Sequence, residues 1–226
     1  MMVKNNRVGM RWLLILGIVI SGMVMADQRA PDPASERDVV MTPPPVAGLL
    51  EDLQRRFPAY STAQVILVDA TLQRLLLIEQ GQVTGSWVIS TAEAGLGSQK
   101  GSNQTPLGVH RVAQRFGDGA PLGTIFKARR NTGLVARILT EPGARSQADN
   151  VTTRILWLDG LEPGLNKGGQ VDSFERYIYI HGTDEEGRLG APASHGCIRM
   201  RNQDVVELYQ RVGVDTLVVI ARQRSR

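Results

Sequence analysis

The sequence predicts a mainly β domain, built as a sandwich or barrel with one or two short packed helices. From residue 63 onward, short apolar runs recur between turns that contain Gly and Pro, a pattern typical of such folds. Only two segments, residues 46–57 and 202–212, place apolar residues at helical spacing. The roughly 200 residues after the N-terminal segment are enough for one domain with a substantial core.

Residues 1–26 have the three parts of a secretory signal peptide. A basic start with Lys4, Arg7 and Arg11 precedes an apolar run, and Val24-Met25-Ala26 ends it with the pattern of a cleavage site. The run is shorter than the roughly 20 residues that a membrane-spanning helix needs. We therefore expect an exported protein, in a periplasm, cleaved near Asp27. An uncleaved membrane anchor is the alternative.

Residues 27–62 are predicted to form a Pro-rich linker followed by a short amphipathic helix. Residues 27–45 contain five prolines and almost no apolar periodicity, as expected of a linker. The helix is expected from Val46 to Phe57, ended by Pro58 and packed on the domain through Val46, Leu49, Leu50, Leu53 and Phe57. The main domain then covers residues 63–226.

Seven strands and a late helix are expected within this domain. The strands are residues 64–68, 75–78, 83–91, 109–112, 154–158, 176–180 and 216–220. The helix is expected to begin with Asn202 as its N-cap and to end at Gly213. Its buried stripe is Val205, Val206, Leu208, Tyr209 and Val212.

The charge distribution gives no sign of nucleic-acid binding. The formal net charge is +4, but the signal segment holds three of the basic residues and none of the acidic ones. Residues 27–226 are therefore nearly neutral, with no Lys/Arg stripe and few aromatic residues.

The only cysteine, Cys197, lies in the polar turn Ser194-His195-Gly196-Cys197. Exported proteins usually pair their cysteines, so an unpaired thiol needs a reason. Inert buried thiols usually lie in apolar runs, and this turn is polar. The sequence therefore favours a nucleophilic thiol over a structural one, and such a thiol needs a base nearby.

Two of the three histidines, His181 and His195, are candidates for that base. His181 shares a strand face with Tyr177 and Tyr179 and is expected at the strand's end. The following loop is long enough to bring Cys197 back to it, so we assign His181 as the base. His195 is too close in sequence for that role and is expected to support the turn or to position substrate.

A metal site and a papain-like protease are both disfavoured. The separation of His181 and His195 matches no compact zinc motif, although with Cys197 they would supply three ligands. In papain-like proteases the cysteine precedes the histidine, the reverse of the order here. We expect no metal and no other cofactor.

Residues 63–221 resemble the L,D-transpeptidase catalytic domain, the YkuD-like family of bacterial cell-wall enzymes. The resemblance rests on His181-Gly182-Thr183 and on Ser194-His195-Gly196-Cys197-Ile198-Arg199-Met200, with Thr105-Pro106-Leu107-Gly108 in support. Two positions depart from the pattern. Arg199 stands where members often have Asn, and Ala92 replaces the glycine expected after Ser90-Thr91.

This resemblance implies acyl transfer on peptidoglycan stem peptides. Cys197 would attack a tetrapeptide stem before its terminal D-alanine, with His181 as base and the Gly182 carbonyl orienting the imidazole. The N–H groups of Gly196 and Cys197 would hold the oxyanion. The candidate substrate contacts are Ser194, Tyr179 and Arg199, although Arg199 can equally brace the turn. A carbapenem is expected to acylate the same thiol.

The sequence leaves the acyl acceptor open. Transfer to a stem amine would give 3→3 cross-links, and transfer to a lipoprotein lysine would anchor that lipoprotein to the wall. Transfer to a free D-amino acid would exchange the terminal residue, and transfer to water would be L,D-carboxypeptidase activity. A non-catalytic wall-binding protein is the remaining alternative, and the intact His181 and Cys197 argue against it. The expected partners are stem peptides and, for anchoring, a lipoprotein. Membrane contact is expected only through an uncleaved N-terminal segment.

Overall fold

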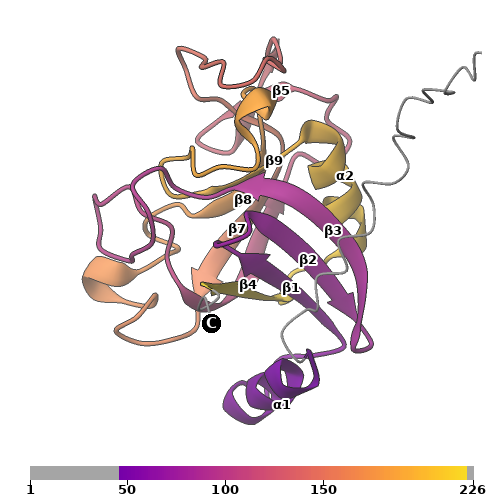
Figure 1. Cartoon of the computed structure of the whole chain (residues 1–226), viewed down its shortest axis with the longest axis vertical. Coiled ribbons are helices and arrows are strands. Elements are labelled where there is room, and N and C mark those ends of the chain that lie inside the picture. The colour runs from indigo at the N-terminus through magenta and orange to yellow at the C-terminus, as the bar shows by residue number, and fades with distance from the viewer. Residues whose placement is uncertain (1–45, 223–226) are drawn as a thin grey trace, which may run out of the picture. The chain divides into compact units, whose positions relative to one another are not determined.

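The computed structural model describes residues 46–222, so the predicted signal peptide and Pro-rich linker lie outside the described residues (Figure 1). The helices are α1 (Val46–Arg56) and α2 (Asn202–Arg211), with short 3-10 helices η2 (Gly169–Val171) and η3 (Glu186–Arg188). The strands are β1 (Gln64–Asp69), β2 (Arg74–Glu79), β3 (Gln82–Ser90), β4 (Gly108–Phe116), β5 (Thr124–Lys127), β6 (Arg130–Val135), β7 (Val151–Gly160), β8 (Tyr179–Thr183), β9 (Ile198–Met200) and β10 (Leu217–Ala221).

The strands form one sheet that closes on itself. Their order is β4-β10-β1-β2-β3-β9-β8-β7, and β7 also pairs with β4. The β5–β6 hairpin extends from the first residues of β7, where Ile125 pairs with Thr152. This arrangement confirms the predicted mainly β, barrel-like fold.

Alternation along the strands creates two hydrophobic layers. In β1, Ile66 and Val68 belong to the central core, whereas Val65 and Leu67 point to a second cluster on the other face. α2 closes the central core with Val205, Leu208 and Tyr209, and its C-cap Val212 packs beside them. α1 covers the second cluster with the buried Leu53, and Figure 1 shows the two helices on different sides of the sheet.

Several predicted element boundaries are wrong. The strand expected over residues 176–180 is β8, which starts later and runs through His181 to Thr183, so His181 does not end it. Tyr177 lies before the strand with φ of 57° and does not share its alternation. Asn202 is the first residue of α2, and Arg201 is its N-cap. The C-cap of α2 is Val212 rather than the predicted Gly213, which does not have the positive φ of a capping glycine.

Three strands were missed, namely β5, β6 and β9. Residues 117–150, which show no sequence pattern, contain the β5–β6 hairpin. Within residues 46–222, neither helix is long and apolar enough to span a bilayer.

Candidate active site

The turn that carries Cys197 is fixed by hydrogen bonds before β9 begins. Ser194 Oγ accepts the Gly196 N–H at 3.2 Å and donates to the Cys197 carbonyl at 2.6 Å. Thr105 Oγ1 donates to the Gly196 carbonyl at 2.9 Å. Gly196 has φ of 128°, a conformation that residues with a side chain rarely adopt. The turn therefore holds Cys197 in one defined position.

Strand register brings Cys197 and His181 to the same face of the sheet. β8 and β9 run parallel, with His181 paired with Arg199. Cys197 immediately precedes β9 and lies beside Tyr179, whose N–H donates to Sγ at 3.4 Å. Paired residues point to the same face and alternate along each strand. Cys197 is two residues before Arg199, the pairing partner of His181, so His181 and Cys197 are diagonal neighbours on one face.

The surroundings of the Cys197 thiol favour its neutral form. Cys197 is half-buried, and its S–H donates to the Tyr177 carbonyl at 3.4 Å. Burial raises the pKa of the thiol to about 11, and the Tyr179 N–H that points at the sulfur offsets only part of this rise. A base is therefore needed to generate the thiolate at neutral pH.

His181 is placed to be that base. Its ring is buried, and Nδ1 lies 2.6 Å from the Gly182 carbonyl, so Nδ1 carries the proton and Nε2 is left to accept one. Burial lowers the pKa of His181 to about 4, although the Gly182 carbonyl favours the protonated ring. Position 182 has no room for a side chain, because a Cβ there would lie 2.6 Å from Asn202 Oδ1.

These pKa values predict the pH dependence of Cys197 alkylation by iodoacetamide. The rate should fall as pH drops through about 4, where His181 becomes protonated and can no longer accept the thiol proton. It should rise again near pH 11, where the thiol ionises unaided. His181→Gln should lower the intervening plateau by roughly 10²–10⁴-fold and leave the upper rise. An inflection near the ordinary histidine pKa of about 6.5 would contradict this assignment.

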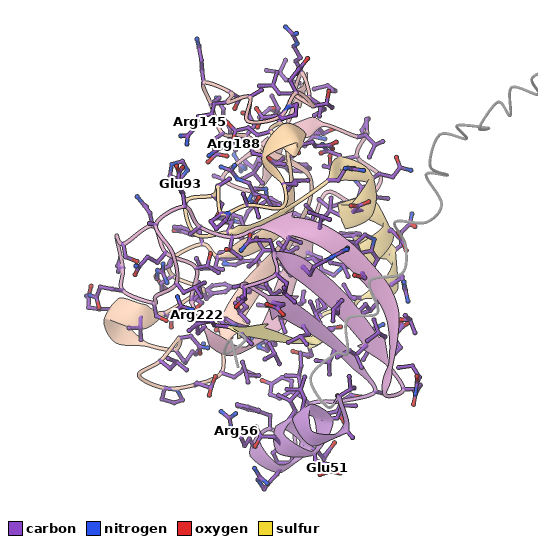
Figure 2. All side chains as sticks on the ribbon, viewed as in Figure 1. Glu51, Arg56, Glu93, Arg145, Arg188 and Arg222 are labelled. Atoms are coloured by element: carbon purple, nitrogen blue, oxygen red, sulfur yellow. The ribbon has the colours of Figure 1, made fainter. Side chains whose placement is uncertain are left out.

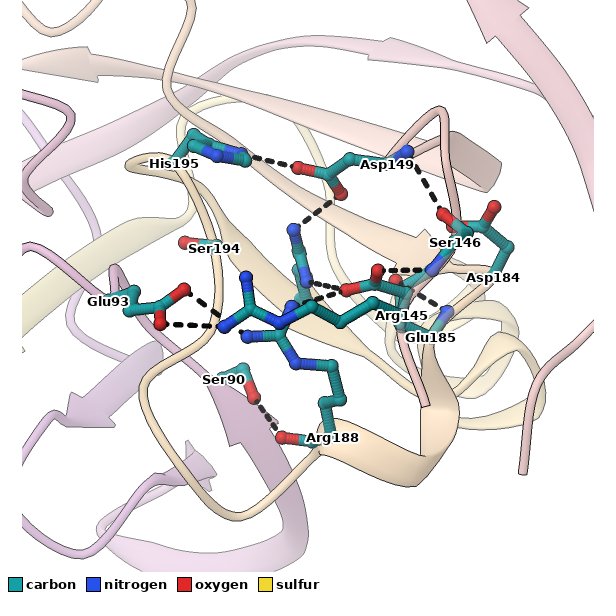
Figure 3. A network of polar contacts seen from close by, with 12 residues as sticks. Ser90, Glu93, Arg145, Ser146, Asp149, Asp184, Glu185, Arg188, Ser194 and His195 are labelled. Carbon is teal, nitrogen blue, oxygen red and sulfur yellow. Dashed lines mark hydrogen bonds and ion pairs between the residues drawn. The ribbon is translucent and has the colours of Figure 1, made fainter. Parts of the chain in front are cut away.

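Beside this pair, Asp149 binds His195, as Figure 3 shows, and also forms an ion pair with Arg199. One carboxylate oxygen lies 2.6 Å from His195 Nδ1, and the other forms an ion pair with Arg199. Asp149 comes from the loop before β7, whereas His195 and Arg199 flank Cys197 on the turn and on β9. The site is therefore assembled from two segments that are distant in sequence.

The ion pairs continue outward from Arg199 to the surface. Arg199 is 1% exposed and also binds Glu185, at 2.8 Å. Glu185 binds Arg188 at 2.7 Å. Glu93 then joins the mostly buried Arg188 to the exposed Arg145. Figure 2 shows these three residues close together. This chain of charges fastens the loop before β7 and η3 to the strand that follows the thiol.

An aromatic wall borders the thiol on another side. It consists of Trp157, Phe174, Tyr177 and Tyr179. Trp157 stacks on Phe174 with ring centroids 3.9 Å apart and meets the edge of Tyr179 at 5.7 Å. Arg129, at the tip of the β5–β6 hairpin, lies 4.4 Å above the Trp157 ring and donates to the Tyr179 hydroxyl at 3.0 Å. Tyr177 is 53% exposed, so this wall reaches the surface beside Cys197.

Several predicted contacts have other partners in the structure. Ser194 is buried and braces the turn, which argues against a substrate contact. The Gly196 N–H is bound to Ser194, which argues against its oxyanion role. Arg199 is held by two carboxylates, which favours bracing. The Tyr179 side chain is buried against Trp157, although its backbone N–H touches the thiol.

Sequence reasoning missed Asp149, Glu185 and Arg129. Asp149 and Arg129 lie in a segment with no periodic pattern, so no local signal reports where they point. Glu185 follows His181 closely but resembles any charged loop residue. Over residues 46–222, no three His, Cys, Asp or Glu side chains are grouped closely enough to bind a metal ion.

A family model for the L,D-transpeptidase catalytic domain, YkuD, matches residues 63–220. The Bacillus subtilis protein named "Putative L,D-transpeptidase YqjB" is 51% identical over 80 residues, which cover 33% of this chain and 46% of that protein. "Probable L,D-transpeptidase YbiS" of Escherichia coli is 44% identical over 43 residues, covering 19% and 14%. The matching segments thus span less than half of these relatives.

Among solved structures, the chain is similar to an Ldtfm–avibactam carbamoyl enzyme. The identity is 19%, the TM-score is 0.45, and the match covers 73% of this chain and 51% of the other. An L,D-transpeptidase 3 from Mycobacterium tuberculosis in complex with a faropenem-derived adduct gives 14% identity and a TM-score of 0.44, with coverage of 70% and 60%.

Proposed function

The chain belongs to the L,D-transpeptidase catalytic domain (YkuD) family, and on this premise we propose that it transfers acyl groups between peptidoglycan stem peptides, with Cys197 as the nucleophile. The observation that carries the proposal is the diagonal placement of one thiol and one buried, neutral imidazole on the same face of β8 and β9. Such a pair supplies a nucleophile and its base.

The proposed acylation step follows from these two side chains. His181 Nε2 takes the thiol proton as Sγ attacks the carbonyl between the third residue and the terminal D-alanine of a tetrapeptide. The C–N bond then breaks, His181 returns the proton to the leaving amine, and a thioester remains on Cys197. The Cys197 N–H is the proposed oxyanion donor, since that of Gly196 already binds Ser194. No cofactor takes part.

In the second half-reaction, the amine of another stem attacks the thioester and forms a 3→3 cross-link. We favour this acceptor, with a lipoprotein lysine, a D-amino acid and water as alternatives. The test incubates purified protein with tetrapeptide muropeptides and identifies products by mass spectrometry. A cross-linked dimer with release of D-alanine supports the proposal. A tripeptide alone would indicate a carboxypeptidase, and unchanged muropeptides would favour a wall-binding protein.

We propose that the protein acts outside the cytoplasmic membrane, in a periplasm, because its proposed substrate is found there. We expect the mature protein to begin near Asp27. N-terminal sequencing of the protein from cell fractions checks this. Full-length protein in the membrane fraction would indicate an anchor tethered by residues 27–45. Full-length protein in the cytosol would contradict export altogether.

A further inference from the structure

The acylation step leaves one histidine of the site without a role. The His195 side chain is 69% exposed, in contrast to the buried His181. Its Nδ1 is 2.6 Å from Asp149 Oδ2. An ionised carboxylate can only accept a hydrogen bond, so Nδ1 carries the proton and Nε2 keeps its lone pair. The pair has the arrangement in which an aspartate sets the tautomer of a histidine base.

Asp149 is held firmly enough to orient this ring. One carboxylate oxygen binds His195 and the other forms an ion pair with Arg199. The Asp149 N–H donates to Ser146 Oγ at 3.0 Å (Figure 3). Its φ of 43° is unusual for a residue with a side chain, and such conformations persist where the surroundings enforce them. Burial raises the pKa of Asp149, but Arg199 and His195 outweigh this and hold it below its usual value.

The second half-reaction needs a base in this position. The attacking amine is an ammonium ion at neutral pH, with an ordinary pKa of about 10.4, and must lose a proton before it can attack. His181 is neutral again after acylation, but it is buried, and it must supply the proton that Cys197 Sγ takes up when the C–S bond breaks. The acceptor ammonium has to lose two protons in all, so the first of them calls for a second, exposed base. His195 is exposed and lies two residues before Cys197. The hydrogen bonds of Ser194 to Gly196 and Cys197 hold the turn that carries both residues.

We propose that His195, oriented by Asp149, is the base that deprotonates the acceptor amine, a role that rests on the transpeptidase function proposed above. His195 Nε2 takes one proton from the ammonium and later releases it to solvent. The amine lone pair forms the new C–N bond to the thioester carbonyl, and the C–S bond breaks. His181 takes the second amine proton and passes it to the departing Cys197 thiolate.

The test measures the two half-reactions separately in the full chain. Acylation is followed by D-alanine release from a tetrapeptide stem, and transfer by product formation with a stem tripeptide as acceptor. His195→Gln should keep acylation within about threefold and slow transfer roughly 10²-fold or more. Asp149→Asn should also slow transfer, because it removes the carboxylate that orients His195. Arg145→Gln, at the exposed end of the same ion-pair chain, is the matched control and should affect neither step.

Two further readouts separate a base from a structural support. Hydroxylamine is unprotonated at neutral pH, so its reaction with the thioester should not depend on His195. The transfer defect of His195→Gln should also shrink as pH approaches the pKa of the amine, about 10.4. Equal slowing with hydroxylamine and tripeptide, or unimpaired transfer to the tripeptide, would overturn the proposal. Absence of D-alanine release by the unmodified protein would overturn the transpeptidase function itself.

Discussion

Cys197→Ala is expected to abolish D-alanine release and carbapenem acylation while the fold remains intact. The thiol makes two long hydrogen bonds, with Tyr177 and Tyr179, and packs at the edge of a hydrophobic cluster. The turn itself is held by Ser194 and Thr105. Loss of such a small side chain should cost about 1 kcal/mol, which corresponds to a decrease in Tm of roughly 2–4 °C for a domain of this size. Loss of the nucleophile should leave no covalent intermediate.

Intact-mass spectrometry with a carbapenem checks the chemical part of this prediction. The unmodified protein should gain one adduct per chain, on the peptide from Ser194 to Met200, because a strained lactam carbonyl acylates an activated thiolate. Thermal unfolding of both proteins checks the structural part. An adduct that persists in Cys197→Ala would refute the site, and a large loss of Tm would identify Cys197 as a structural thiol.

The strands and the Cys–His pair are predictable from local sequence because both depend on alternation and turn residues. Val65 to Val68 alternate between two apolar layers, and the structure places them so. Cys197 and His181 meet because β8 and β9 are neighbours. The register between two parallel strands depends on the whole sheet. The sequence therefore predicts that Cys197 and His181 are close together, but it does not predict how the two side chains are placed.

What could not be predicted depends on contacts between distant segments. Ala128 and Arg129 both have positive φ at the tip of the β5–β6 hairpin, where Asn-Gly is the usual signal. The strand expected at residue 176 starts later because Tyr177 adopts a left-handed conformation. Asp149 meets Arg199 across 50 positions of sequence, and no local pattern reports such a pair.

The buried position of Arg199 leads to the largest expected effect on stability. Arg199 is 1% exposed and bound to both Asp149 and Glu185, the latter itself only 3% exposed. Removal of the guanidinium leaves these carboxylates without their shared buried cation. Breaking a buried ion pair in this way typically costs about 3–5 kcal/mol. Arg199→Met should therefore lower the free energy of unfolding by about that amount.

Urea unfolding of Arg199→Met and Arg145→Gln side by side tests this expectation. Arg145 is 62% exposed and bound to Glu93, which is 54% exposed, so replacement of Arg145 should cost at most about 1 kcal/mol. Adding Glu185→Gln to Arg199→Met should recover part of the loss, because it removes one of the two buried carboxylates that have lost Arg199, although Glu185 still has Arg188 as a partner. A small, equal loss in the two single variants would show that Arg199 is not the brace of this site. Arg199→Lys keeps the charge but cannot bind two carboxylates in a planar fork. Its loss of unfolding free energy should therefore lie between those of Arg199→Met and Arg145→Gln.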